Sequence, residues 1–290
     1  MRPVATFSIV AWDPRRKEWG VAVQSKFFAV GAIVPWCEAN AGAVATQSYA
    51  NLTYGPRGLQ LMRQGRSASE TIELLVQDDP VASFRQVGVV DRNGIAAAYT
   101  GDDCFGWAGH IVGDGFTCQG NILVPGTLEA MVECFRAHRN TEGELADWLV
   151  AALSAGQAAG GDSRGRQAAS VTVVREGSGY GGDNDRYIDL RVDDDPEPIE
   201  KLQRLLELHH LYFGKANPAD LVPMENVVAD LQEILVKAGH SQVEKSGVFD
   251  EATKNALIAL VLIENLAERW SGDENQIDQK VVNFLKNKFQ

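Results

Sequence analysis

The chain has 290 residues, of which 45% are hydrophobic and 23% are charged, and its formal net charge is −12. This composition is typical of a globular protein with one or two domains. An acidic chain lacks the basic surface that attracts nucleic acids and anionic membranes, so we expect neither as a partner.

The sequence gives no indication of export, of a membrane span or of a metal site. Residues 1–10 are strand-like and lack the features of a signal peptide, and the apolar run 256–263 is too short to cross a bilayer. The four cysteines form neither a CxxC pair nor a Cys/His zinc spacing; they are Cys37, Cys104, Cys118 and Cys134. We therefore expect a cytoplasmic protein with reduced thiols, no metal and no cofactor.

Alternating residues predict an antiparallel hairpin at the start of the chain. Residues 6–12 and 19–26 have strand patterns and are joined by a polar turn. Because side chains alternate along a strand, Thr6 and Ser8 should share one face of the first strand. A third strand, built from small residues, is predicted at 41–47.

Helical spacing then alternates with further strand patterns. One helix opens at 55–58, and Ser67 with Glu70 forms a capping box that begins the next. An Asp-Arg-Asn-Gly turn joins two more strands. Listed in chain order, the later elements are strands at 84–90 and 95–99, helices at 127–138 and 141–155, strands at 168–174 and 187–192, and a helix at 200–213. This order predicts an α+β layered domain with largely antiparallel sheets.

The strand patterns end at the segment 214–218. Beyond it, three helices are predicted at 227–238, 250–269 and 277–289. We therefore predict three parts, which are an α/β domain over 1–213, a linker over 214–219 and a helical domain over 220–290.

The N-terminal hairpin resembles the opening of N-terminal-nucleophile (Ntn) hydrolases, in which the first residue of the mature chain is the nucleophile. More closely, residues 6 to about 213 resemble a bacterial family of Ntn-hydrolase-like proteins of unknown function. The resemblance lies in residues 25–32 (SKFFAVGA), 34–36 (VPW), 42–47 (GAVATQ), 54–59 (YGPRGL), 119–123 (QGNIL) and 160–167 (GGDSRGRQ). It implies a four-layer αββα sandwich, and it implies no particular substrate.

The resemblance implies that Thr6 is the nucleophile. A free α-amine has a pKa of about 8, so it can act as the base for the hydroxyl of its own residue. Lys26, on the same hairpin, would lower the pKa of that amine through its charge. Asn121, in a segment that reads as a turn, would donate to a developing oxyanion.

The glycine-rich loop at 160–167 supplies the remaining candidates. Asp162, Arg164 and Arg166 would orient the amine or bind a substrate carboxylate.

The sequence departs from the Ntn pattern because five residues precede Thr6. An amide nitrogen is no base, so Thr6 can act in this way only after residues 1–5 are removed, and we expect those residues to lie across the cleft as a plug.

Two functions remain open. One is hydrolysis of a small amide or peptide-like bond, and the other is a non-catalytic ligand-binding or scaffolding role.

The C-terminal region resembles small three-helix peptidoglycan-binding domains. The resemblance lies in the Leu-Gln pair at 231–232, the Gly-Val-Phe-Asp turn at 247–250 and the helix after it. Asp250 should cap that helix. Without an export signal, binding to wall peptidoglycan is not expected.

Three aromatic residues that look exposed suggest a homo-oligomer; they are Phe27, Phe28 and Trp36.

Overall fold

The structure, a computed structural model, describes residues 6–139, 141–214 and 216–289. Its contacts divide the chain into two compact units between Leu206 and Glu207. Among the helices in these ranges, none combines the length and the apolar character needed to cross a membrane.

The first unit contains a six-stranded sheet in the order β10-β9-β2-β1-β8-β7, and all neighbouring strands are antiparallel. Its strands are β1 (Thr6–Asp13), β2 (Glu18–Ser25), β7 (Gly109–Gly113), β8 (Phe116–Asn121), β9 (Ala168–Val174) and β10 (Arg186–Val192). The predicted hairpin forms its centre, with Thr6 opposite Ser25 and Asp13 opposite Glu18.

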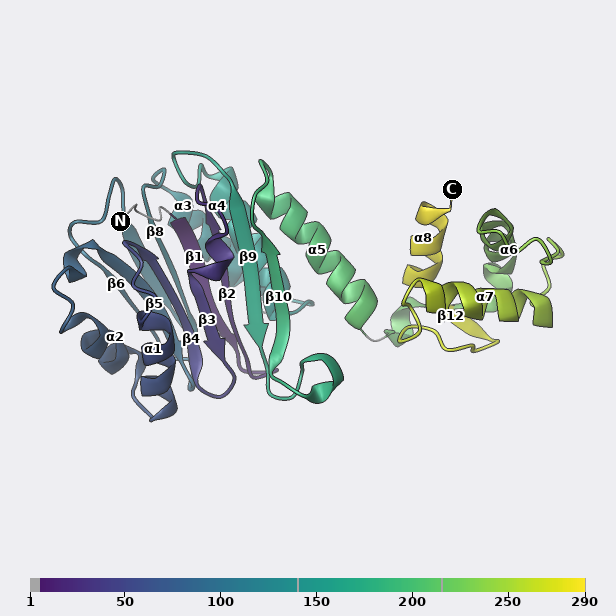
Figure 1. The fold of residues 1–290 in the computed structure, drawn as a ribbon, viewed down its shortest axis with the longest axis horizontal. Helices are drawn as coiled ribbons and strands as arrows, with labels where there is room; N and C mark the ends of the chain where they lie inside the picture. Colours follow the sequence, from purple (N-terminus) through teal and green to yellow (C-terminus); the bar gives the residue numbers. More distant parts are fainter. Residues whose placement is uncertain (1–5, 140, 215, 290) are drawn as a thin grey trace. The chain divides into compact units, whose positions relative to one another are not determined.

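A second, four-stranded antiparallel sheet lies against the first in the order β3-β4-β5-β6. Its strands are β3 (Pro35–Glu38), β4 (Gly42–Ser48), β5 (Arg85–Asp91) and β6 (Ala96–Thr100). The outer face of this sheet is covered by α1 (Tyr54–Arg63) and α2 (Ala68–Val76), whereas α3 (Thr127–His138) and α4 (Leu145–Ala158) cover the six-stranded sheet (Figure 1). The expected α+β fold with four αββα layers is confirmed.

Strand alternation sorts the β1 side chains between two environments. Phe7 and Ile9 pack into the core with α3 and α4, whereas Val10 packs between the sheets. Thr6 and Ser8 lie on the same face as Val10, as the alternation predicts. Polar groups therefore line one end of the space between the sheets.

Three strands of the first unit were not predicted from the sequence: β3, β7 and β8. The segment Gly120-Asn121 was read as a turn, and this was wrong, because it ends β8 and pairs with β1. Glycine and asparagine disfavour strands, but pairing with β1 on one side and β7 on the other overrides that local preference.

The aromatic residues behind the predicted self-association surface are also placed differently from expectation. Only Phe28 is exposed, at 61%. Phe27 and Trp36 are partly buried against the cores. Trp36 lies so close to Gly55 that a Cβ on residue 55 would fall 2.1 Å from the indole. Oligomerisation remains a prediction.

The second unit contains three helices and a small two-stranded sheet around its own core. These elements are α6 (Val228–Lys237), α7 (Glu251–Ile263), α8 (Gln279–Lys288), β11 (Leu221–Pro223) and β12 (Gln276–Asp278). The Asp250 carboxylate caps α7 as predicted, accepting the N–H of Thr253 at 2.8 Å. This helix ends at Ile263 rather than at 269, because Asn265 adopts a left-handed φ of 58°.

The remaining helix, α5 (Pro198–Phe213), spans the boundary between the units. Short 3₁₀ helices lie at Val30–Ala32, Ala82–Phe84, Tyr180–Gly182, Pro218–Asp220 and Met224–Asn226.

Candidate functional site

Thr6 begins β1 and is completely buried, with 0% exposure. Its hydroxyl lies 3.2 Å from the hydroxyl of Ser25, the residue opposite it on β2. On its other side Thr6 faces Asn121, the last residue of β8. Three polar side chains from adjacent strands thus lie on the sheet face that meets the second sheet.

Ser25 was not identified as a candidate from the sequence, although the signal was present. The turn between β1 and β2 sets the register of the hairpin, and counting outward from Asp13 and Glu18 pairs residue 6 with residue 25. A hydroxyl beside the predicted nucleophile could therefore have been found from the hairpin alone.

Asp162 joins the strand ends around Thr6. The residue is 2% exposed, and its carboxylate accepts the backbone N–H of Lys26 at 2.9 Å. It also accepts three hydrogen bonds from Arg164, from the backbone N–H at 3.0 Å, Nε at 3.1 Å and Nη2 at 2.9 Å. Asp162 further forms an isolated β-bridge with Leu123, two residues after β8 ends. The predicted loop thus lies beside the ends of both strands that flank Thr6.

The Lys26 side chain has a different environment. It is exposed, and its ammonium donates to the Arg166 carbonyl at 3.1 Å. The Arg166 guanidinium pairs with Glu197 and lies 4.0 Å from Glu200. Lys26, Arg166 and Glu197 line an open groove of about 430 Å³, in which the Arg166 guanidinium already has an acidic partner. The Lys26 side chain is therefore exposed to solvent, whereas Thr6 is completely buried.

A buried polar network connects Thr6 to the second sheet. The amide nitrogen of Gln47 on β4 donates to the Thr6 carbonyl at 3.4 Å and to Gln86 Oε1 at 2.9 Å. Asn121 donates to the same Gln86 oxygen at 3.0 Å, and Ser8 donates to Gln47 Oε1 at 2.7 Å. Buried hydrogen bonds of this kind fix the positions of the groups they join.

Gln119 extends the network and depends on a glycine in the facing sheet. Its amide nitrogen donates to Ser8 Oγ at 2.6 Å. A Cβ on residue 88 would fall 2.1 Å from the Gln119 side-chain oxygen, so Gly88 makes room for this amide. None of these glutamines was singled out from the sequence, because their convergence depends on how the two sheets pack.

The backbone is strained on both sides of the site. Ser48 and Ile122, the residues after Gln47 and Asn121, have φ angles of 64° and 54°. A β-branched residue in this region is a genuine outlier that costs about 1–3 kcal/mol. The Ile122 N–H donates to the Phe105 carbonyl at 2.9 Å. Strain of this kind is common at functional sites.

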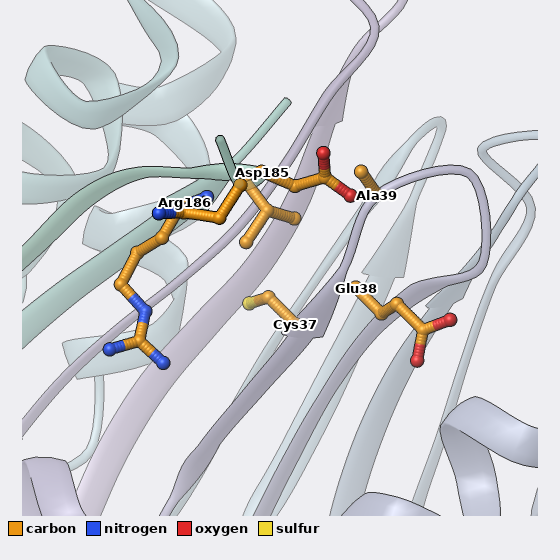
Figure 2. A pocket seen from close by; sticks show the side chains of 7 residues that line it. Cys37, Glu38, Ala39, Asp185 and Arg186 are labelled. Atoms are coloured by element: carbon orange, nitrogen blue, oxygen red, sulfur yellow. Dashed lines mark hydrogen bonds between the residues drawn. The ribbon is translucent and has the colours of Figure 1, made fainter. Parts of the chain in front are cut away.

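A cavity of about 470 Å³ lies near the opposite end of the sheets (Figure 2). Its lining residues are Cys37, Glu38, Ala39, Val174, Asn184, Asp185 and Arg186. Burial raises the pKa of the Cys37 thiol, so this group is a poor nucleophile. None of the predicted site residues lines this cavity. Thr6, Ser25 and Asn121, which we call the Thr6 site, lie at the other end of the six-stranded sheet. The predicted plug, residues 1–5, falls outside the described residues.

Comparisons with known proteins extend this picture. Residues 6–202 match the family model described as "Family of unknown function (DUF1028)", and residues 212–285 match the one described as "Putative peptidoglycan binding domain". The C-terminal unit therefore contains a peptidoglycan-binding-like domain. No curated protein matches the chain.

The solved structures similar to this chain include one that covers most of both chains. A crystal structure of a Silicibacter pomeroyi protein of the DUF1028 family is 28% identical, with a TM-score of 0.64 over 71% of this chain and 86% of that one. Anbu (ancestral beta-subunit) from Yersinia bercovieri is 10% identical, with a TM-score of 0.31 over 70% of this chain and 94% of that one, which is too low to support an argument. Because the first family model covers most of the chain, the protein belongs to the DUF1028 family of unknown function.

Proposed function

We propose that the chain is an amidohydrolase of the N-terminal-nucleophile type, acting on a small amide or peptide-like bond after residues 1–5 are removed. The observation that supports this most strongly is the position of Thr6. Its hydroxyl lies at a strand end, between Ser25 and Asn121, beside a buried network and two strained residues.

The proposed reaction needs only the first residue of the shortened chain as nucleophile and base. Hydrolysis of the bond between residues 5 and 6 leaves Thr6 with a free α-amine, which takes the proton of the Thr6 hydroxyl as Oγ attacks the substrate carbonyl. The C–N bond then breaks, the amine passes this proton to the leaving nitrogen, and an ester remains on Oγ. Water cleaves the ester, releasing the acid and restoring the hydroxyl.

The neighbouring predicted residues would support these steps. In the proposal Asn121, opposite Thr6, donates to the oxyanion that forms on the substrate carbonyl. The charge of Lys26 favours the neutral amine. Asp162 positions the site by holding the Lys26 backbone, and Arg164 shares its carboxylate. Arg166 would contribute to substrate binding only by leaving Glu197.

A second candidate is a non-catalytic ligand-binding protein. It is favoured by the complete burial of Thr6 and by the Lys26 ammonium, which is held by the loop backbone. In that case the buried network has a purely structural role, and shortening the chain changes no activity.

The test compares the full chain with a chain that begins at Thr6, produced by cleaving a fusion directly before that residue. Release of amine from a panel of simple amides should be detected only for the shortened chain. Thr6→Ala in the shortened chain should abolish it, and Thr6→Ser should retain part of it. Thr53→Ala, at an exposed threonine, is the control. Equal activity in the full chain, or activity that survives Thr6→Ala, would exclude the proposal.

A further inference from the structure

Three aromatic side chains form a cluster just beyond the strand ends of the Thr6 site. The ring centroids of Tyr49 and Phe84 lie 5.4 Å apart, those of Tyr49 and Phe105 lie 5.7 Å apart, and those of Phe84 and Phe105 lie 6.3 Å apart. A pocket of about 300 Å³ is lined by Tyr49, Val81, Phe84 and Arg85. The Phe105 ring is not among these lining residues but packs against Tyr49 and Phe84 beside them, and we call the lining residues together with Phe105 the aromatic pocket.

Each ring is connected to the Thr6 site by the backbone. Tyr49 lies two residues after Gln47, and the Gln47 amide donates to the Thr6 carbonyl. Phe84 lies two residues before Gln86, and the Gln86 side-chain oxygen accepts a hydrogen bond from Asn121.

The third ring reaches the site through a loop. The Phe105 carbonyl accepts the N–H of Ile122, the strained residue directly after Asn121. The aromatic pocket and the Thr6 hydroxyl therefore belong to the same end of the sandwich.

The charge in the aromatic pocket is already compensated. The Arg85 guanidinium binds Asp79 through two contacts, Nε to Oδ2 at 2.9 Å and Nη2 to Oδ1 at 3.4 Å, and it also donates to the Tyr49 carbonyl. Burial would raise the pKa of Asp79, but hydrogen bonds from Arg85, the Val81 N–H, Asn51 and Tyr54 hold that pKa at about 2, so the carboxylate stays ionised. A paired guanidinium has little left to offer a second carboxylate.

We infer that the aromatic pocket is the subsite for an apolar side group of the substrate, so that the preferred substrates are amides with an aromatic or branched aliphatic group beside the scissile bond. This inference rests on the proposed function for the position of that bond. Val81 and Phe105 are 42% and 39% exposed, so apolar surface is accessible for a ligand to cover. Burying an aromatic ring there should strengthen binding by about tenfold or more.

The test measures binding separately from turnover. N-acetylphenylalaninamide and N-acetylglycinamide share the amide group and differ by the ring, and NMR titration gives their Kd values on the full chain and on the chain that begins at Thr6. We expect the first ligand to bind about tenfold more tightly to at least one of the two chains. Phe105→Ala should remove most of that preference, whereas Phe28→Ala, an exposed phenylalanine outside the pocket, should leave it intact.

The outcomes distinguish this inference from the proposed function. Equal Kd values for both ligands on both chains, or the same effect of Phe105→Ala and Phe28→Ala, would overturn the aromatic subsite. Ring-dependent binding without any amide hydrolysis would keep the subsite and refute the hydrolase. Hydrolysis with no preference for the ring would keep the hydrolase and refute the subsite.

Discussion

At the scale of single residues, Gln86 carries much of the contact between the two sheets. Its amide oxygen accepts from Gln47 and Asn121, and its amide nitrogen donates to Thr100 and to the carbonyls of Gly109 and Gly120. Removing this amide takes one hydrogen bond from each of these partners.

We therefore expect Gln86→Leu to lower the free energy of unfolding by about 3 kcal/mol, since each hydrogen bond that is lost contributes about 0.5–1.5 kcal/mol. Urea unfolding followed by circular dichroism measures the change. Gln60→Leu, on an exposed position of α1, should change stability by less than about 0.5 kcal/mol. Similar losses in both variants would show that the network adds no stability.

Glu18 gives the molecule a pH dependence of known sign. It is completely buried at the end of β2 away from Ser25, and burial raises the pKa of its carboxyl to about 7, although the charge of Arg175 opposes this. The folded state then binds a proton more tightly than the unfolded state, whose glutamate titrates near 4.5. This contribution to stability is complete below about pH 4.5 and is lost as pH rises through about 7.

Wild type should therefore lose about 2–3 kcal/mol of stability relative to Glu18→Gln between pH 4.5 and 7.5. Urea titrations across this range measure the difference. Glu133→Gln removes a charge from an exposed position of α3, and its free energy of unfolding should change with pH as that of wild type does. If the difference in free energy of unfolding between wild type and Glu18→Gln did not change with pH, the raised pKa of Glu18 would be contradicted.

The candidate site could be predicted only in part at this scale. Thr6 and Asn121 were named from the sequence and lie opposite each other in the sheet. The network of Gln47, Gln86 and Gln119 could not be predicted, because it depends on packing between two sheets whose strands are far apart in sequence.

At the scale of elements, the start of α2 is specified by its own residues. Ser67 accepts the N–H of Glu70 at 3.3 Å, and Glu70 accepts the N–H of Ser67 at 2.9 Å. This capping box was predicted from the sequence and is confirmed.

Ser67→Ala should lower the free energy of unfolding by about 1 kcal/mol, because it leaves a helix N–H without its acceptor. Ser69→Ala, two residues into the helix and exposed, should be neutral or slightly stabilising. Thermal unfolding of both variants checks the pair, and equal melting temperatures would exclude a role for the cap.

Local signals account for the elements that the sequence predicted. Capping residues, turn residues and alternation gave α2, the β1–β2 hairpin and the β5–β6 hairpin. By contrast β8, with Gly120 and Asn121 at its end, is a strand because of its neighbours rather than its composition.

At the scale of the whole molecule, the division into two units follows from two separate cores. Leu202 and Leu206 belong to the core of the first unit, whereas Leu211 and Tyr212 pack with that of the second. The change of pattern near 214 predicted two domains. The exact limits of 1–213 and 220–290 remain a prediction, since α5 contributes residues to both cores.

The central claim is that Thr6 becomes a nucleophile once it begins the chain. The most direct measurement is intact-mass spectrometry after exposure to an acylating β-lactone. The chain that begins at Thr6 should gain one acyl group, located on Thr6 by fragmentation. The full chain and the shortened Thr6→Ala variant should gain none there. A folded shortened chain that stays unmodified at Thr6, or a full chain that is modified there equally, would contradict the account.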